Sequence, residues 1–417
     1  MKHDSVVSFD PVDATPWLVA TEAVPRPRVD TIGQIGSTIF VGGLFNKAAR
    51  PGGAPEYGLS NFMAFDSTAG TLRSALDPNY VDPSFNGPVW AIATLGNAVY
   101  VGGRFSSVNG IVRNGLVKLD AQTGAVDPIF NAEFAKGIVR DLQMWTNPDG
   151  TWMLIVGGSI SKKLIALDPE TGSDTGYFDL NISDPIPGAW GRTAVYQLAI
   201  DPSGTKLVAT GNFLTVDGQA RSRLFVANLG RAAATLDDWY YPGFAQPCAS
   251  DEPRRVAYLQ GVDFSPDGAY FVVAATGEHS VYEDEIWPKG DAAYHTVCAA
   301  AARFDVSDDD QPVWINYTGG DSLWAVVVTG AAVYVQGHNR WLDNPYGKNS
   351  PEEGAVERSG IGAIDAESGK ALNWWPRKPA MMGGKAFLAT STGLWVGSDS
   401  ERFNNELHRG IAFVPLP

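Results

Sequence analysis

The chain has 417 residues, of which 46 are glycine, 27 are proline and 46 are aromatic (13 Trp, 14 Tyr and 19 Phe), and 44% are hydrophobic. This hydrophobic and aromatic content excludes an intrinsically disordered protein, despite the many Gly and Pro residues. The net charge of −15, from 31 Lys and Arg against 46 Asp and Glu, excludes the basic surface that binds nucleic acid backbones or anionic membranes.

Three features bear on the location of the chain. No apolar run approaches the roughly 18 residues of a membrane-spanning helix, so we expect no membrane span. The first five residues lack the apolar core of a signal peptide, and we expect that any export signal was removed or never present. The two cysteines, Cys248 and Cys298, cannot build a zinc site alone, and they indicate either one disulfide in an oxidising compartment or two buried thiols.

One unit of about 60 residues repeats along the chain. Its best-formed copy has a first apolar run at residues 89–95, a turn at 96–97, a second run at 98–105, a third at 115–120 and a weaker fourth at 126–130. Each run is bounded by turn residues, which is typical of β-strands. The first run recurs, so that successive copies start near residues 29, 89, 139, 195, 259, 323 and 384.

The turns repeat as well. Pro and Gly stand at fixed places in residues 147–150, 201–204 and 265–268, which suits hairpins, and an Asp-to-Gly turn follows the third run at 66–70, 120–124, 168–172 and 365–369. The pattern predicts an all-β chain that forms a single domain over residues 1–417, a seven-bladed β-propeller of four-stranded antiparallel blades. The seventh unit has only three strands, so we expect residues 1–28 to contribute a closing strand that pairs with the C-terminal blade. An open solenoid is the alternative, but it would need capping units.

The repeat resembles the delta-60-type β-propeller repeats of secreted bacterial proteins. The resemblance is carried by Val-Tyr-Val-Gly-Gly-x-Phe at residues 99–105 and Val-Asp-Pro-x-Phe at residues 126–130, with similar residues at 337–347, 397–399 and 410–413. The Gly-Gly doublet is also similar to that of kelch blades, although the Tyr and Trp expected later in a kelch blade are not placed here. The resemblance implies a propeller and secretion, and it carries over no activity.

Long connections between the second and third runs occur at residues 44–60, 277–300, 337–358 and 398–409. In a propeller these loops share one face, and we expect the binding site there. Cys248 precedes the fifth unit and Cys298 ends its long loop, so both fall on this face and a disulfide is geometrically reasonable. The bridge would be worth about 4 kcal/mol on the chain-entropy model, and it would indicate a secreted or cell-surface protein.

One variable position lies between two apolar positions at the start of each first run. It is occupied by Asp30, Trp90, Arg140, Tyr196, Gln260, Trp324 and Lys385. In a propeller these residues would surround the mouth of the central channel. Indoles that stack and charged groups that orient a ligand are typical of a binding surface, so we predict that this column binds substrate. The alternative is that they are ordinary rim residues of a water-filled channel.

The densest polar segment is residues 337–347, which contains His338, Arg340, Trp341, Asp343 and Tyr346. Indoles stack on sugar rings, and Arg binds hydroxyls or uronates, so we predict that Arg340, Trp341 and Tyr346 bind a saccharide. Glycoside hydrolysis would need two carboxylates, drawn from Asp30, Asp141, Asp321, Asp343 and Asp399. A lyase would instead use His338 or Tyr346 as a base, with Arg140 or Arg340 neutralising the substrate. The alternative is a polar loop packed for its own stability.

We therefore predict a secreted, monomeric enzyme that cleaves glycosidic bonds of a poly- or oligosaccharide, with hydrolysis favoured over lyase chemistry. Its candidate catalytic residues are Asp141, Asp321, Asp343, Asp399 and His338. The alternative is a non-catalytic propeller that binds carbohydrate or a cell surface. No nucleotide-binding motif or metal-ligand spacing is present, so we expect no cofactor, with structural calcium at residues 308–310 as a weaker alternative. His295 and Cys298 resemble half of a metal site, but Cys298 is better used in the disulfide.

Overall fold

The computed structural model describes residues 5–12, 15–246, 248, 257–277, 296–307, 311–347, 350–381 and 383–417. Their regular structure is almost entirely antiparallel β-sheet, which confirms the all-β class. The chain divides into two compact units, which we name for their order in the sequence and describe separately. The flanking unit comprises residues 7–177 and 384–417, and the middle unit comprises residues 178–383 with residues 1–6. In the described ranges, no helix is long and apolar enough to cross a membrane.

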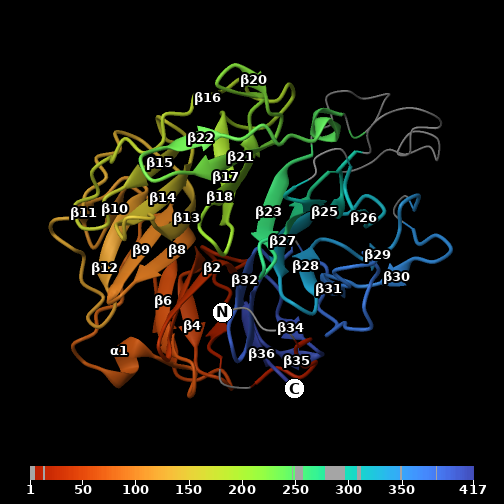
Figure 1. Cartoon of the computed structure of the whole chain (residues 1–417). Coiled ribbons are helices and arrows are strands. Elements are labelled where there is room, and N and C mark those ends of the chain that lie inside the picture. The colour runs from red at the N-terminus through yellow and green to blue at the C-terminus, as the bar shows by residue number, and fades with distance from the viewer. Residues whose placement is uncertain are drawn as a thin grey trace. The chain divides into compact units, whose positions relative to one another are not determined.

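The flanking unit contains the first three repeats and the seventh (Figure 1). Their sheets are β2 (Arg28–Ile35), β3 (Thr38–Leu44), β6 (Phe62–Asp66) and β7 (Thr71–Leu72); β8 (Val89–Leu95), β9 (Ala98–Gly103) and β12 (Leu116–Asp120); β13 (Val139–Thr146), β14 (Trp152–Gly158) and β15 (Leu164–Leu167); and β32 (Ala386–Ala389), β33 (Gly393–Gly397) and β36 (Ile411–Pro415). Smaller elements are β1 (Trp17–Leu18), β4 (Lys47–Ala49), β5 (Glu56–Gly58), α1 (Arg73–Leu76), β10 (Ser107–Val108), β11 (Ile111–Val112), β34 (Arg402–Phe403) and β35 (Glu406–Leu407).

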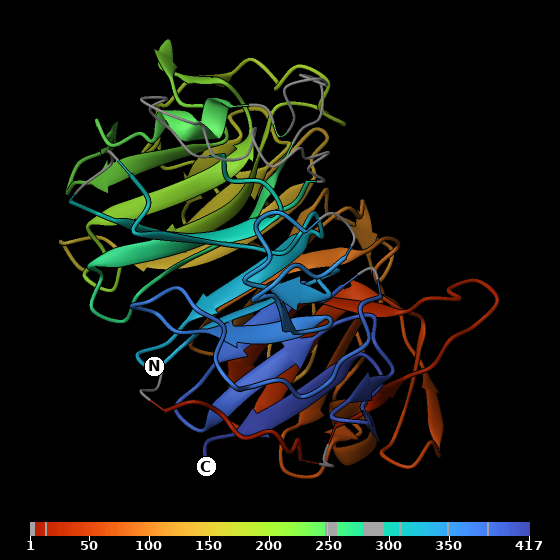
Figure 2. The same ribbon diagram turned by 90° about the vertical axis from the view of Figure 1, so that its right-hand side faces the viewer.

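The two ends of the chain meet within the flanking unit. Strand β2 packs beside β32, and the Val29 amide donates a 3.0 Å hydrogen bond to the Ser398 carbonyl. Figure 2 shows the red N-terminal strands beside the blue C-terminal ones. The amides of Ser8 and Val12 donate to the carbonyls of Pro415 and Phe413 on β36, at 2.8 and 3.0 Å. A shared core that includes Val29, Ala386 and Trp395 therefore joins the first and seventh repeats.

The middle unit contains the fourth, fifth and sixth repeats, whose first strands β17, β23 and β27 pack side by side (Figure 1). Their sheets are β17 (Ala194–Ile200), β18 (Lys206–Asn212), β21 (Leu224–Leu229) and β22 (Ala234–Leu236); β23 (Leu259–Phe264), β24 (Tyr270–Ala275), β25 (Ala300–Asp305) and β26 (Trp314–Tyr317); and β27 (Leu323–Val328), β28 (Val333–Gly337) and β31 (Ile361–Ile364). Smaller elements are β16 (Ile182–Ser183), β19 (Thr215–Val216), β20 (Gln219–Ala220), the 3-10 turn Pro242–Ala245, β29 (Trp341–Leu342) and β30 (Val356–Glu357).

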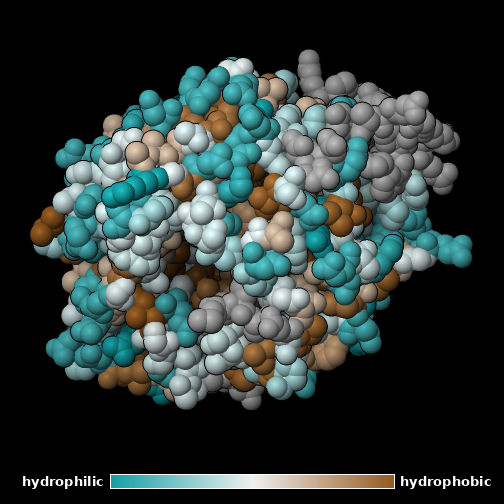
Figure 3. Space-filling view, viewed as in Figure 1, coloured by the Kyte–Doolittle hydropathy of each residue, from teal (hydrophilic) through white to brown (hydrophobic). Residues whose placement is uncertain are grey.

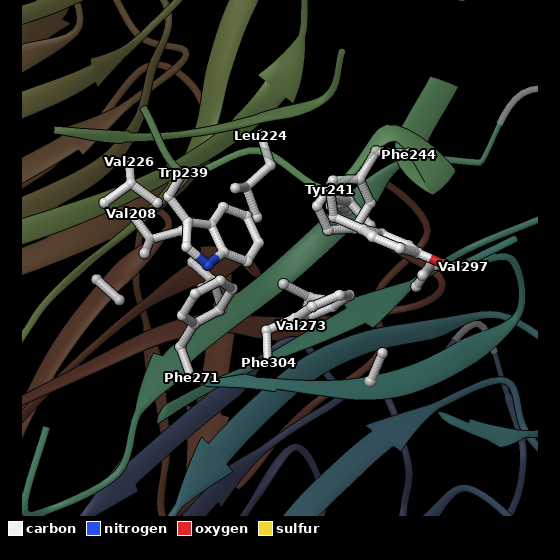
Figure 4. Close-up of a cluster of buried hydrophobic side chains, with 14 of the residues drawn as sticks. Val208, Leu224, Val226, Trp239, Tyr241, Phe244, Phe271, Val273, Val297 and Phe304 are labelled. Atoms are coloured by element: carbon white, nitrogen blue, oxygen red, sulfur yellow. The ribbon is translucent and has the colours of Figure 1, made fainter. Parts of the chain in front are cut away.

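Aromatic side chains fill the core between the fourth and fifth repeats (Figure 4). The Trp239 indole packs edge-on against Phe271 and Phe304, at centroid distances of 5.1 and 5.6 Å. Its Nε1–H donates to the carbonyl of Asp305, so the only polar atom of this large side chain is satisfied. This core fixes β23 and β24 beside β18 and β21, and their ends carry part of the pocket described below.

The fourth strand varies among the repeats. It is present as β7, β22 and β26, but in the second, third and sixth repeats a single bridge takes its place, at Leu119–Val126, Leu167–Asp174 and Ile364–Ala371. In the second repeat Pro128 has no amide hydrogen to donate, which limits the pairing that follows Val126. The uniform four-stranded repeat expected from the sequence is therefore seen in only part of the described chain.

A left-handed residue directly precedes the third strand in every repeat. These residues are Asn61, Gly115, Lys163, Arg223, Ala299, Gly360 and Gly410, with φ between 48° and 88°. In six of them the carbonyl accepts a hydrogen bond from an amide at or just after the end of the second strand. This shared backbone geometry anchors the base of each connection between the second and third strands, although the residue types differ.

Candidate functional site

A pocket of about 480 Å³ opens in the middle unit, where second strands end and first strands begin. Its walls come from the residue that follows Thr276, from the segment before β27, from the segment after β28, and from residue 380. The lining residues are Gly277, Gly320, Asp321, Ser322, His338, Arg340 and Ala380. Asp321, His338 and Arg340, all singled out in the sequence, thus lie in one pocket.

An ion pair between Asp321 and Arg340 dominates this pocket. Nε and Nη2 of Arg340 donate to the two carboxylate oxygens of Asp321 at 2.9 and 2.8 Å, and the Arg340 amide donates at 3.0 Å. The Asp321 side chain is 6% exposed, whereas that of Arg340 is 37% exposed. Hydrogen bonding and charge pairing with Asp321 raise the pKa of Arg340. Asp321 therefore fixes the orientation of a permanent cation at the edge of the pocket.

Two aromatic rings accompany Arg340. Its guanidinium carbon lies 4.5 Å from the centroid of the Trp341 ring, which is a cation–π distance. The His338 amide donates to the Ser322 carbonyl at 2.8 Å, and Nδ1 of the exposed His338 ring contacts the Met381 carbonyl. Because a carbonyl only accepts, Nδ1 carries the proton in this contact, which leaves Nε2 as an acceptor in the neutral ring.

Asp343 and Tyr346 belong to the same loop but do not line the pocket. The Asp343 carboxylate accepts hydrogen bonds from the Asn316 side chain at 2.7 Å and from the Ala371 amide at 3.1 Å. The Asp343 amide in turn donates to the Asn316 side chain. These bonds give Asp343 a structural role, tying β29 to β26. The Tyr346 side chain is exposed, at 41%.

The predicted column shares one backbone feature that the sequence did not reveal. In six first strands the pairing register shifts across the column residue, between Val29 and Thr31, Val89 and Ala91, Val139 and Asp141, Val195 and Gln197, Leu259 and Gly261, and Leu323 and Ala325. The column residue is therefore the extra residue of a β-bulge, while Lys385 directly precedes β32. Bulges release a side chain from the regular alternation, which explains why this position varies.

Four column residues gather in the flanking unit. Asp30 accepts hydrogen bonds from Nε of Arg28 at 2.9 and 3.1 Å. Burial raises the pKa of Asp30, although the charges of Arg28 and Lys385 oppose this shift, and burial likewise lowers the pKa of Lys385. The Arg140 guanidinium lies 4.6 Å from the Trp90 ring centroid. The charge of Arg140 adds to the lowering of the Lys385 pKa, so the buried Asp30 and the half-buried Trp90, Arg140 and Lys385 form one charged cluster with an indole.

The other predicted residues are not among the lining residues of the pocket and are distributed between the two units. In the flanking unit, the negative charge of Asp399 adds to the rise that burial causes in the pKa of Asp30, and it opposes the fall that burial causes in the pKa of Lys385. The Asp141 carboxylate accepts a hydrogen bond from the Leu142 amide at 2.8 Å. In the middle unit, the Tyr196 ring lies tilted against the Tyr258 ring with centroids 6.0 Å apart, and Gln260 and Trp324 are half-buried. Arg28, Ser322 and Tyr258 contribute to these clusters but were missed. The repeat alignment would have found all three, because each directly precedes the first apolar residue of a first run, at Val29, Leu259 or Leu323.

The structure also bears on the predicted disulfide and metals. Cys248 and Cys298 are bonded, with Cα atoms 5.8 Å apart, which confirms the predicted bridge. Among the residues that the structure describes, no group of three or more His, Cys, Asp or Glu side chains could hold a metal ion. Residues 308–310 and His295, considered for metal binding, lie outside the described residues.

Known proteins resemble this chain in parts or at low identity. Residues 98–130 match the family described as "Domain of unknown function (DUF5122) beta-propeller". This short match supports a β-propeller. No curated protein matches the chain. Similar solved structures include the computationally designed protein Ika8 (12% identity, TM-score 0.47, 96% of this chain and 98% of that one) and the β-propeller domain of Myceliophteria thermophila Cps50 (Swd1) (12% identity, TM-score 0.42, 74% and 79%).

Proposed function

We propose that this protein is a secreted or cell-surface β-propeller of seven blades that binds a poly- or oligosaccharide through the middle-unit pocket. The seven repeats, each with a comparable first strand, support the blade number. The hydrogen bonds of Ser8 and Val12 to β36 support closure of the last blade by the N-terminal segment. The Cys248–Cys298 bridge is consistent with an oxidising compartment.

The Asp321–Arg340–Trp341 arrangement carries the binding proposal. A guanidinium held by a buried carboxylate and stacked on an indole is preorganised, so little conformational entropy is lost when a ligand binds. Its charge suits sugar hydroxyls or the carboxylate of an acidic sugar. Because the ion pair exists before binding, Asp321 acts as a positioning residue for Arg340.

We favour binding over cleavage because hydrolysis needs two carboxyl groups, and the described lining of the pocket has one. Glycoside hydrolysis uses two carboxyl groups about 5 to 10 Å apart, with a water or the sugar between them. Asp321 is the one Asp or Glu among the described residues that line this pocket, and it is engaged by Arg340. Cleavage remains a second candidate because the exposed His338 ring lies in the same pocket and is suited to proton transfer.

Incubation with a panel of neutral, acidic and furanose-containing polysaccharides tests both functions, with binding measured by calorimetry and products by mass. We expect binding by the wild type and, for Arg340→Lys, an affinity about tenfold lower, because a lysine keeps the charge but loses the planar fork. Arg231→Ala, an exposed residue of the same unit outside the pocket, serves as the control.

Three outcomes discriminate the candidates. Binding without products supports the binding function. Products heavier by one water per cut would mean hydrolysis, and products with an unsaturated end would mean a lyase. The proposal is wrong if no polysaccharide binds, or if Arg340→Lys and Trp341→Ala both bind as tightly as the wild type while remaining folded.

A further inference from the structure

Trp190 is the most exposed large hydrophobic side chain of the described residues, at 89%. It lies in the segment between β16 and β17 of the middle unit. An indole left in water forgoes the favourable burial of its large apolar surface. Single exposed hydrophobic side chains are common on protein surfaces, so the significance of Trp190 depends on how its backbone is held and on what lies near it.

The segment that carries Trp190 is anchored on both sides. Asn212, fully buried at the end of β18, accepts the Ile186 amide at 2.9 Å and donates to the Arg192 carbonyl at 3.2 Å. The Trp190 amide donates to the Tyr258 hydroxyl at 2.6 Å. The backbone around the indole is therefore held by side chains from the fourth and fifth repeats.

These anchors connect Trp190 to the pocket. The Tyr258 amide donates to the Thr276 hydroxyl at 3.0 Å, and the Thr276 amide donates to the Tyr258 carbonyl at 2.9 Å. Gly277, the next residue, lines the pocket, and its amide approaches the Ser322 hydroxyl at 3.4 Å. Trp190, Tyr258 and the pocket thus lie at the same ends of adjacent first strands within one unit.

Exposed apolar side chains of the middle unit concentrate near the ends of the first strands at which the pocket lies. Of its four large exposed hydrophobic residues in the described ranges, only Val313 lies in a turn between third and fourth strands. The other three are Trp190, Tyr346 and Met381, and the Met381 carbonyl contacts His338 of the pocket. The face shown in Figure 3 is mainly hydrophilic with separate hydrophobic patches.

We propose that Trp190 is a second, distal subsite that stacks on a sugar ring of an extended oligosaccharide whose other part occupies the Arg340 pocket. This inference rests on the proposed carbohydrate binding. A single anchored indole beside a polar pocket suits a chain of sugars, whose rings have apolar faces and polar edges. A protein partner would require a larger continuous contact surface.

Binding of short and long fragments tests the subsite, using a disaccharide and a hexasaccharide from the panel polysaccharide that binds most tightly. For Trp190→Ala we expect about tenfold weaker binding of the hexasaccharide but less than about twofold change for the disaccharide, because only the long fragment reaches the distal ring. Trp190→Phe should restore most of the affinity. Trp152→Ala, which removes a 43% exposed indole at the start of β14, is the matched control.

Each result decides the question. Equal loss of affinity for both fragments, or no loss for the hexasaccharide, overturns the distal subsite. The pocket proposal survives that result as long as Arg340→Lys still weakens saccharide binding. If no panel member binds the wild type, the carbohydrate function and the subsite both fail. If Trp190→Ala leaves sugar binding unchanged but abolishes capture of a protein by the pure chain, the indole serves a protein partner instead.

Discussion

Three arginines occupy the same place in different repeats: Arg113, Arg221 and Arg358, each two residues before the left-handed residue that precedes the third strand. Each donates to the carbonyl of the residue before it and to a carbonyl in the segment after the third strand, at Val112 and Asp127, Ala220 and Asp237, and Glu357 and Leu372. One side chain thus fastens a short hairpin to the outer edge of its sheet.

We expect Arg358→Met to lower the free energy of unfolding by about 1 to 3 kcal/mol, because the Leu372 carbonyl loses two donors and Arg358 is 8% exposed. Urea denaturation followed by far-ultraviolet circular dichroism measures the change. Lys370→Ala removes a 74% exposed cation of the same repeat, and it should change stability by less than about 0.5 kcal/mol. Equal effects of the two substitutions would contradict the structural role of Arg358.

The sequence identified part of the candidate site. Asp321 was predicted because it stands just before column residue Trp324, and His338 and Arg340 because they belong to the polar loop at 337–347, and the pocket contains all three. Asp343 was predicted for the same reason, but its partners Asn316 and Ala371 come from distant segments that no local pattern reveals. Trp190 was missed because it lies outside the repeat, so aligning the copies did not bring it to attention.

At the scale of elements, the repeat boundaries were predictable because apolar alternation and Gly-containing turns are local signals. The β-bulges were not, since a bulge depends on pairing with the second strand rather than on the residue at its centre. The left-handed position before the third strand escaped notice because Lys163, Arg223 and Ala299 occupy it as well as Gly and Asn. The fourth strands were overpredicted because short turns and proline limit pairing in the second repeat.

We expect the Asp-to-Gly turn at residues 365–369, after the third strand of the sixth repeat, to be sensitive to acid. The Ser368 amide and hydroxyl lower the pKa of Asp365 in the folded state. This contribution is present above the unfolded pKa of about 3.9 and is lost as the pH falls through the lower folded pKa. We expect Asp365→Asn to lower stability at neutral pH by less than about 1 kcal/mol, because water screens the partly exposed carboxylate.

The measurement compares urea midpoints of the wild type and Asp365→Asn at neutral pH and at about pH 3, below the unfolded pKa. The difference should shrink in acid, because protonation progressively removes the charge of the Asp365 carboxylate. Glu367→Gln, at an 84% exposed neighbouring carboxylate, is the matched control. A difference that persists unchanged in acid would exclude the charge as its origin.

At the scale of the whole molecule, the disulfide is the one covalent constraint between distant residues. It joins positions 50 residues apart in the middle unit, and both sulfur-bearing side chains are buried. A cross-link of this length restricts the unfolded chain and stabilises the folded state without adding apolar core.

We expect the Cys248→Ala, Cys298→Ala double variant to unfold at lower urea, with a loss of up to about 4 kcal/mol on the chain-entropy model. Wild-type protein treated with dithiothreitol should show the same loss, and the double variant should not respond to the reductant. A wild type that is indifferent to reduction, despite complete thiol release, would show that the bridge adds no stability.

The division of the chain has a consequence for biosynthesis. Residues 178–383 are one contiguous stretch, so the middle unit can begin to fold while the ribosome is still translating the rest. The flanking unit needs residues 384–417, which emerge after the middle unit, before β32 can cover β2 and Ser398 can accept the Val29 amide. Strand β2, at the edge of its sheet, therefore waits for the intervening residues to be translated before it meets β32, and we expect this edge to need protection from aggregation in the meantime.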